Sequence, residues 1–187
     1  ALYIDKCMLT LNKSKIYFNA YAARKKNSYL EVFTDKILVG DLLELVNSQI
    51  IENNLNEPLV FFKDLKGDFN FKIRLTKKDV NGVVNLNKIS CKFIPVANLP
   101  VMLEKGKIVM TKNDIVLKDF KGYYNNKKAN SIEMEGTVKD YLKTMDTNIV
   151  SRAVVTNDFA KNYFSKLVGI PITLIGGSTK TRLDIKS

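Results

Sequence analysis

The sequence predicts a mainly β protein, built as an antiparallel meander of strands with two short amphipathic helices. The clearest strand runs from Phe69 to Leu75, where every second residue is apolar and Asn70, Lys72 and Arg74 lie between. A period of two is typical of a strand with one dry and one wet face. Turn-forming residues such as Lys66-Gly67 and Asn125 to Asn130 separate such segments. Of the 187 residues, 45% are hydrophobic and 26% charged, which is a globular composition.

The apolar positions of the successive strands are expected to share one dry face. The members of this face in the second part of the chain are Phe69, Phe71, Ile73, Leu75, Val84, Leu86, Ile108, Met110, Ile115, Leu117, Ile132, Met134 and Val138. The phase of the alternation changes between Leu86 and Ile89 and again between Leu117 and Phe120. We therefore expect β-bulges at these two places, because an extra residue in a strand restores the inward direction of the apolar side chains.

Two segments have helical spacing instead. Residues 41–53 place leucine, valine and isoleucine on one side of a helix, with Asp41 near its start. Residues 157–168 do the same with aromatic residues, Thr156, Asn157 or Asp158 can cap the start, and Gly169 follows the end. Both helices are expected to lie against the sheet or at its end.

The distribution of charge and one internal sequence similarity suggest how the chain is organised. The formal net charge is +11, and all of this excess lies after residue 60. This shift favours a boundary near Pro58, with an N-terminal unit of strands and a helix over residues 1–58 and a longer β segment over 59–187. The stretch from Lys63 to Phe69 resembles the stretch from Lys118 to Tyr124, which indicates a repeated β unit.

The composition argues against most enzymes. The chain has no His, so imidazole-based nucleophile pairs and metal sites are excluded, and its two cysteines form no CxxC motif. Glu133 and Glu135 share a strand face, but it is the wet face, so they are interpreted as solvated strand residues. We therefore expect no catalytic residues, no bound metal and no cofactor. Cys7 and Cys91 are compatible with a disulfide or with two free thiols.

Three stretches of the second half resemble the AsmA-like superfamily, which includes the TamB and YhdP envelope proteins. They are Leu103 to Met110, Asn113 to Gly122 and Ile132 to Tyr141, which follow a pattern of alternating strands with a glycine at a fixed place. The resemblance covers about residues 60–155. It implies an elongated sheet curled into an open groove, a β-taco, whose apolar concave face carries lipid acyl chains.

The resemblance also implies a function and a location. The chain would be a lipid-binding segment of a periplasmic envelope protein, anchored in the inner membrane outside this fragment, that shields phospholipid acyl chains on the way to the outer membrane. The apolar face defined above would then be the lipid-binding site. In the alternative interpretation the chain is a structural module that docks an outer-membrane barrel or another envelope protein without carrying lipid. On the residues alone, the same face also fits an ordinary closed core.

The sequence shows neither a signal peptide nor an apolar run long enough to span a bilayer. Because the chain starts at Ala1 and stops within an alternating pattern, we expect a piece of a longer protein; a mature domain after signal removal is the alternative. The excess lysines fit a solvated outer face or attraction to anionic headgroups. Nucleic acid is not expected as a partner, because the aromatic residues alternate with the charges and should point to the opposite face.

Overall fold

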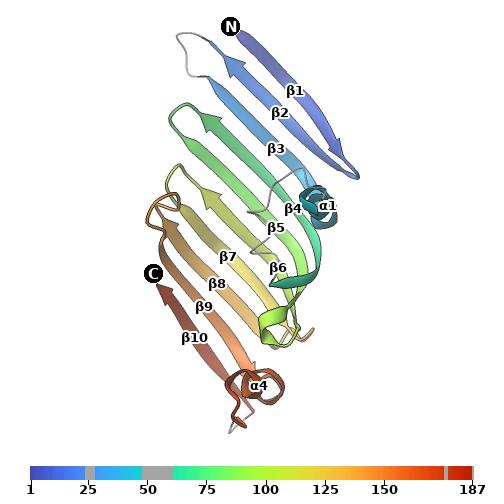
Figure 1. Cartoon of the computed structure of the whole chain (residues 1–187), viewed down its shortest axis with the longest axis vertical. Helices are drawn as coiled ribbons and strands as arrows, with labels where there is room; N and C mark the ends of the chain where they lie inside the picture. The colour runs from blue at the N-terminus through green and yellow to red at the C-terminus, as the bar shows by residue number, and fades with distance from the viewer. Residues whose placement is uncertain (24–27, 48–60, 175–176, 187) are drawn as a thin grey trace.

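One antiparallel sheet of ten strands forms the body of the protein, in the order in which the strands follow in the chain (Figure 1). The computed structural model describes residues 1–23, 28–47, 61–174 and 177–186. The end strands each pair with one neighbour, so the sheet is open and is not closed into a barrel. The predicted fold class, a mainly β chain with an elongated antiparallel meander and two short helices, is confirmed. No described helix has the length and hydropathy needed to cross a membrane.

The strands lengthen toward the middle of the sheet. Their bounds are β1 Leu2–Leu11, β2 Ser14–Ala22, β3 Tyr29–Leu38, β4 Phe62–Thr76, β5 Val80–Phe93, β6 Leu99–Met110, β7 Ile115–Tyr124, β8 Ser131–Lys139, β9 Asp146–Thr156 and β10 Ser178–Lys186. Strand β3 pairs directly with β4, so a single sheet runs through both segments that the charge pattern separates.

Both helical segments lie at the same ends of the strands (Figure 1). Helix α1 (Val39–Asn47) follows β3 and packs on β3 and β4. The rest of the helix predicted over 41–53 lies outside the described residues. The helix predicted over 157–168 is confirmed as a continuous helical run of α3 (Asn157–Phe159), a π-helical turn η2 (Ala160–Phe164) and α4 (Ser165–Val168). A short 3-10 turn, η1 (Ile94–Val96), connects β5 and β6.

The sheet has two unlike long edges, which we name by their contents. The helical rim carries α1, η1 and the run from α3 to α4. The hairpin rim carries the tight turns that follow β4, β6 and β8. The turn after β4 is closed by the backbone bond from Thr76 to Asp79 and the turn after β6 by the bond from Thr111 to Asp114, both 2.8 Å.

A row of β-bulges crosses the middle strands and bends each of them. Lys88 in β5 and Asp119 in β7 have positive φ values of 49° and 54°, and the pairing register shifts beside both. These are the two bulges that the sequence predicts. A bulge bends its strand and increases the local twist. Because the bulges lie beside one another in the pairing from β4 to β7, they form one fold line between the two rims.

The two similar stretches of the sequence, Lys63 to Phe69 and Lys118 to Tyr124, form the same kind of bend in the structure. In its first copy Asp64 has a φ of 55°, and in its second copy Asp119 has a φ of 54°. Each aspartate precedes an apolar residue and is followed three residues later by a glycine pressed against the next strand. A Cβ on Gly67 would lie 2.8 Å from the Cα of Ile89, and one on Gly122 would collide with a backbone oxygen of the neighbouring strand. The two glycines therefore let neighbouring backbones approach at the bend.

The described part of the chain has a small buried core. The buried apolar residues of this core are Ile37, Val39, Leu99, Phe120, Tyr124 and Ala160. Several of them lie near the helical rim, where the helices meet the sheet. Large apolar side chains elsewhere stay open, including Leu30 at 38% and Leu75 at 37% exposed. A protein of this length usually buries more, so much of its apolar surface is not sealed by the described residues.

Candidate functional site: an apolar trough

The thirteen apolar residues singled out in the sequence lie on one face of the sheet. The pairing register links them across the strands, since Phe71 faces Val84, Val84 faces Ile108 and Ile108 faces Leu117. Beyond the bulges the same face continues, because Phe120 pairs with Met134 and Gly122 with Ile132. Bulges at the fold line thus keep the apolar side chains on one side although the alternation changes phase.

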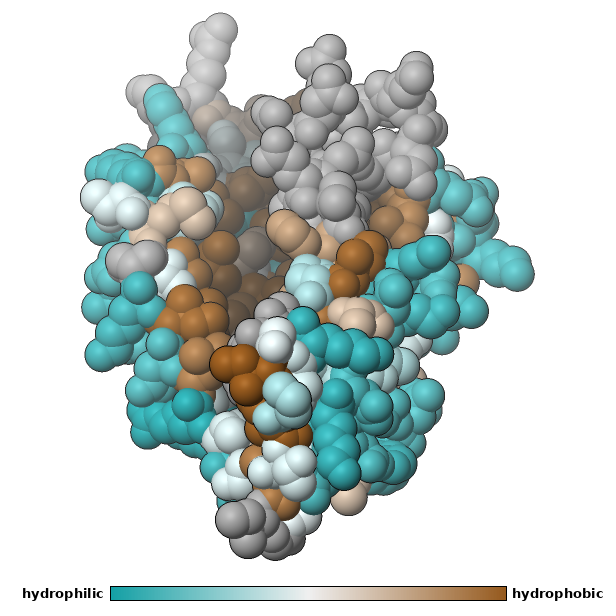
Figure 2. All heavy atoms as spheres, turned by 60° about the horizontal axis from the view of Figure 1, so that its bottom comes forward, coloured by the Kyte–Doolittle hydropathy of each residue, from teal (hydrophilic) through white to brown (hydrophobic). Residues whose placement is uncertain are grey.

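This face lines a hollow of the molecule, which we call the trough. In the end-on view, hydrophobic side chains line a depression between two walls whose outer surfaces are hydrophilic (Figure 2). The face also extends beyond the predicted residues into the first strands, where Leu30 pairs with Leu75 and Val32 with Ile73. The trough is therefore common to the N-terminal strands and to the longer β segment.

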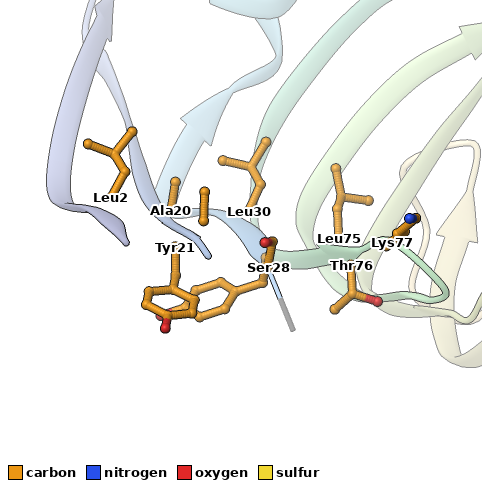
Figure 3. A pocket seen from close by; sticks show the side chains of 10 residues that line it. Leu2, Ala20, Tyr21, Ser28, Leu30, Leu75, Thr76 and Lys77 are labelled. Atoms are coloured by element: carbon orange, nitrogen blue, oxygen red, sulfur yellow. The ribbon is translucent and has the colours of Figure 1, made fainter. Parts of the chain in front are cut away.

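Two cavities lie along the trough. The central cavity, of about 390 Å³, is almost entirely apolar. Its lining includes Phe62, Leu65, Ile89, Cys91, Val101, Leu103, Phe120, Ile132 and Met134. The second cavity, of about 400 Å³, is open and lies among Leu2, Ala20, Leu30 and Leu75. In Figure 3 these four side chains lie on one side of the ribbon, whereas Tyr21 points to the other side.

Glycines and one aromatic ring shape the central cavity. A Cβ on Gly106 would lie 2.9 Å from the ring of Phe120, which is 8% exposed. The missing side chain at 106 therefore makes the space in which this ring packs at the bend. Volumes of about 300 to 1,000 Å³ are usual for sites that hold small molecules. The cavity has the size and the apolar lining for a hydrocarbon guest.

The run from α3 to α4 is fixed to the sheet at the helical rim. Thr156 accepts a hydrogen bond from the Phe159 backbone nitrogen at 3.4 Å, and Gly169 follows the helix with a φ of 71°, as the sequence predicts. The ring of Phe159 packs edge-on against Tyr124 at 4.8 Å. The Tyr124 hydroxyl donates to the Val154 carbonyl oxygen at 2.7 Å, which ties β7 to β9.

Helix α1 is held to the first hairpin by a buried polar cluster. The Ser14 hydroxyl, 1% exposed, donates to the Asp41 carboxylate at 2.6 Å and accepts from the Leu38 backbone nitrogen at 3.0 Å. Asp41 also accepts from the Lys13 backbone nitrogen at 3.2 Å. These hydrogen bonds satisfy the buried carboxylate of Asp41, so its role is to hold helix α1 in place.

The two cysteines are free thiols, and both belong to the apolar face. Cys7 lies on the edge strand β1, opposite Phe18, and is exposed. Cys91 lines the central cavity, where burial raises its pKa above the ordinary value for a thiol. Within the described residues no group of acidic or sulfur ligands is arranged to hold a metal ion.

On the outer face of the first strands, the positions of the aromatic residues differ from the prediction made from the sequence. Aromatic residues were expected only opposite the charges, and this is wrong for β2 and β3. Tyr17 stacks on Phe33 at 5.4 Å on the outer face, and Arg74 lies 4.3 Å from the centre of the Tyr29 ring. The rings there cover one another and hold the guanidinium.

The sequence identified part of the trough and missed much of the central cavity. Of the cavity lining, Ile132 and Met134 are among the predicted residues, while Leu65, Ile89 and Phe120 are not. The signal was present, because the phase changes at Leu86 and Leu117 place Ile89 and Phe120 on the inner face once bulges are drawn there. In β4, Leu65 is in phase with Phe69 across Gly67, whereas Phe62 is hidden by the bulge at Asp64.

The comparisons with known proteins add no assignment. No family model matches the chain, and no match was found among curated proteins or among solved structures.

Proposed function

We propose that this chain is a lipid-binding segment of a bacterial envelope protein of the AsmA-like type, which shields phospholipid acyl chains in its trough during transport between the inner and outer membranes. The observation that carries the proposal is the continuous apolar inner face with its open cavities. Most globular proteins cover such a face with a second layer. Here the described helices lie at one rim, and large inner side chains such as Leu30 and Leu75 stay more than one third exposed.

The energetics favour a hydrocarbon guest. Each methylene group that leaves water for an apolar surface contributes about 0.8 kcal/mol. A chain of fourteen methylenes would therefore gain on the order of 10 kcal/mol before the cost of ordering it. The mechanism is passive: acyl tails lie along the inner face, and the headgroup stays in water between the two rims. No catalytic group is needed for this work, and the conduit is proposed as a non-enzymatic protein.

The experiment is photo-crosslinking at two adjacent positions of β5. Val84 points into the trough, where it pairs with Phe71 and Ile108, whereas Val83 points outward, where it pairs with Lys72 and Val109. Both side chains are half-buried, so they form a matched pair. A photoreactive residue is placed at each position in turn, and the protein is purified from bacteria and analysed by mass spectrometry. We expect phospholipid adducts at 84 and none at 83.

Equal labelling at both positions, or a protein that carries no phospholipid in native mass spectra, would refute the conduit. Substitution of Val84 by Asn should also reduce co-purifying lipid, because it adds a polar group to the inner face, while V83N should leave it unchanged. Circular dichroism of both variants shows whether the sheet is intact.

One observation favours the second candidate, a structural module without lipid. Strand β10 is exposed along its whole length and pairs with β9 without a register shift, and among the described residues no strand lies on its outer edge, so another strand can be added there. Capture of an envelope protein on this edge by a lipid-free chain, abolished when a proline replaces Thr181, would support the module.

A further inference from the structure

The outer side of the fold line carries a cluster of lysines that the trough does not use. Gly106 is buried on the inner side beneath Phe120, so its neighbours Lys105 and Lys107 point outward. The same alternation turns Lys66 and Lys118 outward, Lys88 stands at the bulge of β5, and all five side chains are exposed. We call these five residues the lysine ridge. They come from four neighbouring strands, β4 to β7.

The register forces like charges together in the ridge. Lys107 lies directly opposite Lys118, and Lys105 lies opposite Lys121. Directly opposed side chains in a sheet have Cβ atoms about 5 Å apart, and like charges there destabilise the pair. Of these four lysines, Lys121 has an acidic partner, Glu133, at 3.4 Å. An arrangement that costs stability in the free protein is typical of a surface that meets an anion.

The nearby acidic groups do not neutralise the ridge. Four of them are engaged elsewhere: Asp68 with Lys36 at 3.6 Å, Glu104 with Lys128 at 3.8 Å, Glu133 with Lys121 and Glu135 with Arg152 at 2.8 Å. The remaining carboxylates beside it are Asp119, at the bulge of β7, and Asp64, which pairs with Lys92 at 2.7 Å and whose pKa is lowered mainly by Lys92 and also by Lys66. None of the five ridge lysines forms an ion pair within the described ranges, so the ridge keeps a net positive charge.

We propose that the lysine ridge docks the back of the trough onto the surface of an anionic phospholipid bilayer. The ridge lies where the strands bend, on the outer crest of the sheet, and a flat surface meets a convex one at its crest. Lysine is a compact, hydrated point charge suited to a diffuse anionic surface. The ridge contains no arginine or aromatic ring for stacking on bases, and the described arginines are engaged with Tyr29, Glu135 and Asp184. Such docking is independent of whether the trough holds lipid.

The test is co-sedimentation with vesicles of phosphatidylcholine alone and of phosphatidylcholine containing a quarter phosphatidylglycerol. The ridge variant carries Lys105, Lys107 and Lys118 changed to Gln. Its matched control carries Lys78, Lys112 and Lys143 changed to Gln, which removes the same charge from exposed turns of the hairpin rim. We expect the wild type to bind only the anionic vesicles, with an affinity that falls as salt rises. The ridge variant should bind about 100-fold more weakly, since each surface lysine contributes about a fivefold factor, while the rim variant stays near wild type.

Three results would overturn the proposal. They are unchanged binding of the ridge variant, an equal loss in both variants, and tight binding of RNA or of an acidic protein without binding to anionic vesicles. Thermal unfolding provides a second readout, because removal of the opposed lysines should leave the ridge variant at least as stable as wild type. The V84N variant separates the two functions: it should lose co-purified lipid and keep its affinity for anionic vesicles.

Discussion

Gly106 and Phe120 should be strongly coupled, because the ring occupies the space that a side chain at 106 would fill. Phe120 is 8% exposed, and removal of such a ring as Phe120→Ala should cost about 3 to 4 kcal/mol of unfolding free energy. In Gly106→Ala, the new Cβ would lie 2.9 to 3.1 Å from three atoms of the ring. Overpacking of this kind costs about 1 to 3 kcal/mol, which outweighs the gain of about 0.5 to 1 kcal/mol from replacing a strand glycine.

In the background of Phe120→Ala, Gly106→Ala should stabilise the protein instead of destabilising it. When Phe120→Ala has removed the ring, the methyl group added by Gly106→Ala meets no obstacle and stabilises the strand by about 0.5 to 1 kcal/mol. The coupling free energy between the two sites should therefore be about 2 kcal/mol. Urea unfolding followed by far-UV circular dichroism measures the four proteins of the cycle.

Gly136→Ala is the matched control for this cycle. Its Cβ would lie 2.7 Å from the backbone oxygen of Asn148, which cannot rotate away, so it should destabilise the protein equally with or without the ring at position 120. If Gly106→Ala has the same cost in both backgrounds, the ring does not fill the bend and the geometry of the central cavity described above is wrong.

Three further predictions concern the rim and the thiols. Ser14→Ala should cost about 1 to 3 kcal/mol, because it leaves the Leu38 nitrogen and the Asp41 carboxylate short of a partner; denaturant unfolding measures this, and a change below the experimental error would contradict it. Thr156→Ala should lower stability by about 1 kcal/mol, while Thr156→Ser retains the cap; a shift in melting temperature for both alike would refute the capping role. Cys91 should react with a charged thiol reagent more slowly than exposed Cys7, and its reaction should accelerate only above the ordinary thiol pH range, because burial raises its pKa. Mass spectrometry of partly labelled protein over a pH series measures both rates. Faster labelling of Cys91 than of Cys7 at neutral pH would contradict its place in the cavity.

Local patterns in the sequence predicted much of the fold. The alternation from Phe69 to Leu75 predicts the strand and the face that the register later confirms, because the side-chain period of a strand depends only on its own backbone. The phase changes at Leu86 and Leu117 predict bulges for the same reason. Helix 157–168 was predictable from its cap, its aromatic spacing and Gly169. These features involve interactions between residues close in sequence.

The sequence by itself determined the antiparallel meander, the two bulges after Leu86 and Leu117, and the apolar side of strands such as the one from Phe69 to Leu75. The tertiary structure alone decided that the bulges of β4 to β7 align into one fold line, that Leu65 and Phe120 meet Ile89 and Leu103 in one cavity, and that Lys107 opposes Lys118. Each of these depends on the pairing register between strands, and a shift of one residue would turn every side chain to the other face. Register is set by contacts among residues far apart in the chain, so it emerges only when the sheet is assembled.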